Sequence, residues 1–225
     1  MSDTIKTPTN LSSYYFSSHV RHDLIKLISN KPDKVLEVGC GIGKTGKAIV
    51  EKIGSQVIGL DISAEALSIA QEENCYEKLV ICDLDRTVIP EAIKNESFDC
   101  ILYPDVLEHL TNPWETIKSH MNLLNPDGII IASIPNIRHI YIIKELVFKG
   151  DWSYQDMGIM DKTHLRFFTK KTMIALFEEA GLEITGIKPR SFSGYKLLKT
   201  INRFTSNSLE EFLTTQYLIC AKKKV

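Results

Sequence analysis

The chain has 225 residues, of which 44% are hydrophobic and 24% charged, and these values are typical of a globular domain. A chain of this length buries enough apolar surface to fold without disulfides or a metal, so we expect one domain over residues 1–225. The 27 lysines and arginines nearly balance the 28 aspartates and glutamates, and the net charge of −1 argues against a nucleic-acid-binding surface.

Short apolar runs alternate with amphipathic stretches from residue 20 onward, and this alternation is typical of α/β proteins. Pro32 ends the first predicted helix, and Ser63 is the predicted N-cap of the third. The elements expected in the first half of the chain are a helix over Tyr14–Ile28, a strand over Lys34–Val38, a helix over Lys44–Ile53, a strand over Gln56–Leu60, a helix over Ala64–Gln71 and a strand over Leu79–Cys82.

The second half continues this alternation, and residues 136–168 interrupt it with many aromatic and charged side chains. We expect these residues to be an insertion, and residues 11–30 to form a helical cap. Strands separated by helices imply a parallel sheet, and ligands bind beyond the carboxyl ends of such strands. The elements expected here are a strand over Phe98–Tyr103, a helix over Pro113–Leu124, a strand that follows a turn at 125–128 and runs through Ser133, a helix over Lys170–Ala180, and strands over Glu183–Lys188 and Gln216–Ala221.

A glycine-rich turn, Val-Leu-Glu-Val-Gly-Cys-Gly-Ile-Gly over Val35–Gly43, lies between a predicted buried strand and a helix. Such a turn lets the backbone approach a ligand closely, but it does not identify the ligand. The stretch Gly41–Gly46 matches the dinucleotide fingerprint G-x-G-x-x-G, whereas a phosphate-binding P-loop needs one more residue between Gly39 and Gly43. Glu37 decides against both, because a carboxylate beside the turn repels a pyrophosphate and attracts an ammonium group.

Two aspartates stand at the ends of the next two strands. Asp61 ends the second strand and Asp83 follows the third. Each aspartate alone is equally well explained as a helix-capping or turn residue, but their occurrence at successive strand ends favours a ligand. Together with the glycine turn, these segments resemble the motifs of class I S-adenosylmethionine-dependent methyltransferases over about Val35–Ser133.

This resemblance implies a cofactor, a fold and a set of contacts. The implied cofactor is S-adenosylmethionine, and the implied fold is a Rossmann-like three-layer α/β sandwich whose mostly parallel seven-stranded sheet has a late antiparallel strand. Asp61 would accept both ribose hydroxyls, Ile62 would pack on the adenine, and Asp83 would meet the adenine amino group. The implied cofactor-binding residues are Glu37, Gly39, Cys40, Gly41, Asp61, Ile62, Asp83, Leu84 and Tyr103.

Methyl transfer from a sulfonium is an in-line displacement, so the enzyme mainly aligns the acceptor and excludes water. An oxygen acceptor must also lose a proton. His109 lies just past the fourth strand and is the predicted catalytic base, because histidine titrates nearest to neutral pH. A structural role for His109 is the alternative.

The insertion supplies His139, His164 and Arg166 as predicted acceptor-binding residues. Arginine binds phosphate and carboxylate groups bidentately, although Arg166 could instead form an internal salt bridge with Asp161. The string DKTHLRFFT, which begins at Asp161, resembles a segment in methyltransferases of bacterial cell-surface polysaccharide pathways. This resemblance implies O-methylation of a small polar acceptor such as a sugar or a nucleotide-linked sugar.

The five cysteines form no C-x-x-C pair and lie mostly in apolar stretches, which suits reduced thiols and a cytoplasmic protein. No apolar run approaches the about 18 residues needed to span a membrane. No clustered metal-ligand spacing is visible, so we expect no metal site. The expected partner is a small-molecule acceptor, neither nucleic acid nor a membrane is expected, and the oligomeric state stays open.

Two other functions remain open. A nicotinamide-dependent oxidoreductase is built on a similar sheet, but Glu37 and the pair Asp83 and Leu84 argue against it. A cofactor-binding protein without catalytic activity would keep the same motifs and would differ in having no room for an acceptor.

Overall fold

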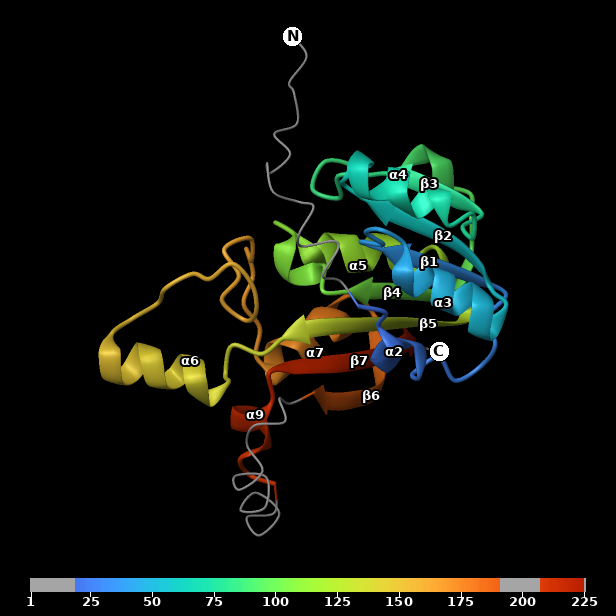
Figure 1. Cartoon of the computed structure of the whole chain (residues 1–225). Helices are drawn as coiled ribbons and strands as arrows, with labels where there is room; N and C mark the ends of the chain where they lie inside the picture. Colours follow the sequence, from blue (N-terminus) through green and yellow to red (C-terminus); the bar gives the residue numbers. More distant parts are fainter. Residues whose placement is uncertain (1–18, 191–206, 225) are drawn as a thin grey trace.

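Seven strands form one sheet in the computed structural model, which describes residues 19–190 and 207–224. Their order across the sheet is β3-β2-β1-β4-β5-β7-β6 (Figure 1). Strands β1 to β5 pair in parallel, and β7 runs antiparallel to both of its neighbours. This confirms the predicted fold and its late antiparallel strand. The strands are β1 Lys34–Val38, β2 Gln56–Asp61, β3 Lys78–Ile81, β4 Phe98–Pro104, β5 Leu124–Pro135, β6 Leu182–Arg190 and β7 Gln216–Lys223.

Helices connect the strands, and in the part of the chain that the structure describes none is long and apolar enough to cross a membrane. The α-helices are α2 His22–Ile25, α3 Lys44–Ile53, α4 Ala64–Glu72, α5 Pro113–Met121, α6 Ile140–Lys144, α7 Lys170–Glu179 and α9 Glu210–Leu213. Two short 3₁₀ turns, η1 Glu91–Ile93 and η2 Leu107–His109, and one π-helical turn, η3 Glu145–Lys149, complete the set.

The sheet has an apolar core on each face, because successive side chains of a strand point to opposite sides. Val35 packs with Leu24 of α2 and Ile49 of α3 on one face. The next residue, Leu36, belongs to the larger core on the other face, which includes Ile117 of α5 and residues of α7. Both faces of the central strands are therefore buried, as expected for a parallel sheet between helices.

The largest departures from the predicted elements concern the first helix and the start of β5, while several other bounds differ by one or two residues. The first predicted helix is present among the described residues only as α2, and the part of Tyr14–Ile28 before residue 19 lies outside them, as does part of the predicted cap. The helix predicted to reach Leu124 ends at Met121, and β5 already begins at Leu124. The predicted turn at 125–128 is an irregularity within β5, since Phe98 pairs with Leu124 and Cys100 with Ile129.

The insertion projects from the end of β5 as α6 and η3 and returns through a long loop to α7 (Figure 1). Its outer part carries large apolar side chains that are mostly exposed, Val147 at 66%, Phe148 at 79% and Met157 at 62%. Its inner part, residues 161–168, packs back onto η2, where the carbonyl oxygen of Glu108 accepts hydrogen bonds from the backbone N–H groups of Leu165 (2.8 Å) and Arg166 (2.9 Å). The insertion thus reaches the carboxyl end of β4.

Candidate functional site

The glycine turn follows β1 at the point where the sheet order reverses between β1 and β4. Gly39, Gly41 and Gly43 have φ values of +72°, +55° and +81°, which favour glycine. The N–H groups of Gly39 and Cys40 donate to the carbonyl of Leu60 in β2, at 2.7 and 3.0 Å. A Cβ on Gly39 would lie 2.5 Å from Cγ2 of Val106, so the turn also contacts the segment after β4.

Asp61 connects the end of β2 to this turn. Its side chain is buried, Oδ2 accepts a 2.7 Å hydrogen bond from the N–H of Gly41, and Oδ1 accepts one of 2.8 Å from the N–H of Ser63. The N-cap of α4 is Ser63, as predicted, since its hydroxyl oxygen accepts from the N–H of Ala66. Asp61 is therefore not the cap, and its contact with the ribose hydroxyls stays a prediction.

Glu37 lies behind the glycine turn. Its carboxylate accepts a 2.6 Å hydrogen bond from the hydroxyl of Tyr76 and a further one from the backbone of Gly46. Burial, opposed by these two hydrogen bonds, raises the pKa of Glu37 to about 8. The side chain is only 1% exposed, and its hydrogen bonds support the backbone behind the turn.

Tyr76 explains two of the glycines that match the dinucleotide fingerprint. A Cβ on Gly43 would lie 3.0 Å from the Tyr76 ring, and one on Gly46 would lie 2.1 Å from its hydroxyl oxygen. A Cβ on Gly59 of β2 would also meet the ring, at 2.9 Å. These glycines leave room for a tyrosine ring, and sequence reasoning missed Tyr76 because it lies in a loop without a motif.

Asp83, which follows the third predicted strand, forms the turn that was the alternative explanation for this residue. Asp83 accepts a hydrogen bond from the N–H of Asp85 at 3.1 Å and forms a salt bridge with Arg86 at 3.2 Å. Leu84 is buried, whereas Ile62 is 50% exposed beside Asp61. An apolar side chain open to solvent at this place fits the predicted contact with a flat adenine ring.

The side chain of Tyr103 does not lie where the resemblance implied. It is fully buried in the core, and its hydroxyl lies 2.6 Å from Nδ1 of His120. Nε2 of His120 donates to the carbonyl of Val88 at 2.7 Å, so Nδ1 is the acceptor for the tyrosine hydroxyl. Burial lowers the pKa of His120 to about 4, which keeps the ring neutral. We therefore assign the Tyr103 side chain to core structure.

The backbone turns sharply after β4 at Asp105, a non-glycine residue with a φ of +57°. Its carboxylate accepts hydrogen bonds from Arg21, from the hydroxyl of Ser133 at 2.9 Å, and from Gln216. Arg21 also donates to Ser133 at 3.0 Å. This network joins the segment before α2 to the end of β4, to β5 and to β7. The strained backbone at Asp105 leaves no signal in the sequence.

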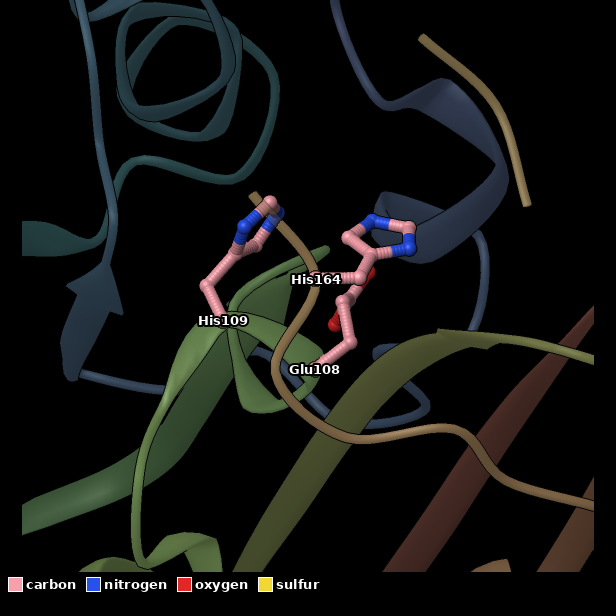
Figure 2. A group of neighbouring side chains, drawn as sticks. All are labelled: Glu108, His109 and His164. Carbon is pink, nitrogen blue, oxygen red and sulfur yellow. The ribbon is translucent and has the colours of Figure 1, made fainter. Parts of the chain in front are cut away.

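Glu108, His109 and His164 meet at the end of η2, and each offers one ligand atom within 4.8 Å of the other two. Figure 2 shows Glu108 and His109 extending from η2 and His164 from the loop above it. The two imidazole rings are 4.7 Å apart in an edge-to-face arrangement. Burial, followed by the charge of Asp105, raises the pKa of Glu108, and burial together with His164 lowers the pKa of His109. Sequence analysis expected no such cluster, because His164 lies far in the chain from the neighbouring residues Glu108 and His109.

The remaining predicted acceptor residues have structural contacts. His139 is the N-cap of α6, and Nδ1 accepts from the N–H of Tyr141. Arg166 donates to the carbonyls of Thr111 and Leu165. Among the described residues, the alternative salt bridge between Asp161 and Arg166 is not formed. Asp161 instead accepts from the hydroxyl of Thr163 at 2.7 Å.

Comparisons with known proteins agree with this geometry. The model of a family described as "Methyltransferase domain" matches residues 14–186. The ubiquinone biosynthesis O-methyltransferase of Rattus norvegicus mitochondria is 29% identical over 196 residues, which are 78% of this chain and 54% of that protein. The protein of the same name from Haemophilus ducreyi is 34% identical over 166 residues, 71% of this chain and 69% of that protein. The chain spans about half the length of several such relatives.

A solved structure shares the fold at low sequence identity. It is an S-adenosylmethionine-dependent methyltransferase from Archaeoglobus fulgidus with a TM-score of 0.58 and 19% identity. The match covers 84% of this chain and 86% of that one.

Proposed function

The chain belongs to the methyltransferase domain family, and from this premise we propose that this S-adenosylmethionine-dependent methyltransferase methylates a hydroxyl group of a small polar molecule, a sugar or a nucleotide-linked sugar. The observation that carries the proposal is the cluster of Glu108, His109 and His164 beside the glycine turn. A cluster of groups able to take a proton or hold a cation suits an acceptor that must be deprotonated.

The residues around the turn fit the cofactor. Gly39 and Gly41 allow the positive φ angles of the turn, Asp61 would supply carboxylate oxygens for ribose hydroxyls, and Ile62 would supply an apolar surface for adenine. Glu37 lies behind the turn, and an ammonium group at the methionine end would favour its ionised form. When bound, S-adenosylmethionine supplies an electrophilic methyl group.

The acceptor side is assigned to η2 and the inner part of the insertion. The contact between Gly39 and Val106 brings η2 against the turn, so a hydroxyl held at the Glu108, His109 and His164 cluster would face the methyl group. Alignment of these two groups supplies most of the rate enhancement of an in-line displacement. His109 is the predicted base, and its proximity to Glu108 and His164 supports a role of the whole cluster in deprotonation.

The relatives support oxygen as the methylated atom, since their names describe O-methyltransferases. The segment resemblance at Asp161 supports a sugar. A second candidate acceptor is a ubiquinone precursor, the class on which those relatives act. The exposed apolar side chains of Val147, Phe148 and Met157 favour it, because an acceptor with an apolar body would bury them.

A panel of acceptors tests the proposal. The protein is incubated with S-adenosylmethionine and free sugars, nucleotide-linked sugars or hydroxylated quinone precursors, and S-adenosylhomocysteine and the methylated product are measured by mass spectrometry. We expect an O-methyl ether of a sugar compound. Methylation confined to nitrogen or carbon would refute the proposal, and methylation confined to the quinone precursors would select the second candidate.

A further inference from the structure

Glu108 is a buried carboxylate without a partner. The residue is 1% exposed, and neither carboxylate oxygen has a hydrogen-bond partner. Burial of an ionised carboxyl group is costly unless a cation or hydrogen-bond donors compensate it. The nearby guanidinium of Arg21 already binds Asp105 and Asp23, so it does not pair with Glu108. The fold therefore presents a buried carboxyl group without a hydrogen-bond partner inside the site, and a bound cation would compensate its ionised form.

The two histidines are held in the tautomer that a metal ligand needs. Nδ1 of His164 lies 3.0 Å from the carbonyl oxygen of Ile159, and a carbonyl only accepts, so Nδ1 carries the proton. Nδ1 of His109 lies 3.3 Å from the carbonyl oxygen of Thr163 and 3.0 Å from its hydroxyl. That hydroxyl donates its own proton to Asp161, so it accepts from His109.

Each ring consequently offers Nε2 with a lone pair. Metal-bound histidines characteristically donate their second N–H to a carbonyl or a carboxylate, which fixes the ring and increases its basicity. His109 reaches the carbonyl of Thr163 in this way and His164 the carbonyl of Ile159. The outer hydrogen bonds of a metal site are thus in place around both rings.

We propose that Glu108, His109 and His164 bind a divalent transition-metal ion. One carboxylate and two imidazoles suit zinc, iron, cobalt or manganese better than calcium or magnesium, which prefer oxygen ligands. Three protein ligands leave coordination positions for small molecules, as in catalytic rather than structural metal sites. The ligand atoms, within 4.8 Å of one another, need only a small contraction to surround one ion.

This inference rests on the proposed O-methylation for its role. A metal ion that binds the acceptor hydroxyl lowers the pKa of that hydroxyl and holds its oxygen in one place. The hydroxyl proton then leaves to solvent, and the oxygen forms its bond to the methyl carbon as the carbon–sulfur bond breaks. His109 acts here as a ligand, which replaces its predicted role as a free base.

The test measures metal binding directly. The full chain is treated with a chelator, dialysed and titrated with Co²⁺, while visible absorption reports coordination and elemental analysis reports stoichiometry; Zn²⁺ then competes. We expect one equivalent per chain. Glu108→Gln and His164→Ala should each weaken Co²⁺ binding by more than about 100-fold, because loss of even an outer partner costs about 10- to 100-fold. His22→Ala is the matched control, since His22 is an exposed histidine outside the cluster.

The Glu108→Gln variant also serves as a control for misfolding. It removes a buried carboxyl group without partners, so the metal-free variant should be at least as heat-stable as the metal-free parent. Absence of Co²⁺ binding by the parent, or Co²⁺ binding by both cluster variants as tight as that of the parent, would overturn the metal site. If chelator-treated protein that binds no metal still methylates hydroxyls, the metal site fails and the proposed function stands. If one metal ion binds and no hydroxyl is methylated, the metal site stands and the proposed function fails.

Discussion

The hydroxyl of Tyr76 donates a 2.6 Å hydrogen bond to Oε2 of Glu37, and the tyrosine ring occupies the space that side chains on Gly43, Gly46 and Gly59 would need. A loop residue after α4 thereby supports the carboxylate behind the glycine turn. The ring thus contacts both α3, at Gly46, and β2, at Gly59, where the glycines leave room for it. Four predictions follow from this and from neighbouring contacts.

Glu37 should make the cofactor-free protein less stable as the pH rises. Its pKa is about 8 in the folded chain, above the ordinary 4.5, so the folded state holds a proton that the unfolded state releases. This stabilisation is complete below about pH 4.5 and is lost as the pH rises through about 8. In the Glu37→Gln variant this loss of stability with rising pH should disappear. Urea unfolding at pH 5, 6, 7 and 8 measures the free energy of unfolding of both proteins. The same dependence on pH in the parent and in the variant would contradict the assignment.

Gly46→Ala should destabilise the fold by about 1 to 3 kcal/mol, because the new Cβ would lie 2.1 Å from the Tyr76 hydroxyl and 2.7 Å from Oε2 of Glu37. Gly186→Ala is the control, since a Cβ there meets nothing within 4 Å. In the background of Tyr76→Ala the substitution at Gly46 should cost less. Additive costs in this double-mutant cycle, measured by denaturant unfolding, would show that Tyr76 is not the obstacle.

Asp61→Ala should weaken binding of S-adenosylhomocysteine by about 1.5 to 3 kcal/mol, the scale of hydrogen bonds to a charged group. The variant also frees the N–H groups of Gly41 and Ser63, so some stability is lost as well. Ser63→Ala separates the two effects, since it removes the cap of α4 and costs about 1 kcal/mol of stability. Calorimetric titration of both variants should show weaker binding only for Asp61→Ala.

Tyr103→Phe should lower stability by about 1 to 3 kcal/mol without a change in cofactor affinity, because it leaves Nδ1 of His120 without its donor inside the core. Thermal unfolding and S-adenosylhomocysteine titration of the same preparation measure the two quantities. A large loss of affinity with unchanged stability would return Tyr103 to the cofactor site.

Local patterns were enough to predict most of the framework. Ser63 was predicted as the cap of α4 from its position before an amphipathic stretch, and the hydroxyl makes that contact. The helix over Lys44–Ile53 and the strand over Lys34–Val38 have the predicted bounds, because a glycine turn between a buried strand and a helix is a local signal. The start of β5 was predicted too late because it depends on a distant strand and not on local signals. Pairing with β4 takes the turn residues at 125–128 into the strand.

The sequence by itself determined the α/β order, the glycine turn and the acidic residues at the strand ends, since each depends on neighbours within a few positions. Tertiary structure alone decided that Tyr76 supports Glu37, that Tyr103 turns into the core, and that His164 joins Glu108 and His109. These contacts join segments far apart in the chain. Their partners are chosen by packing and by the need to satisfy buried polar groups, and neither leaves a periodic trace in the sequence.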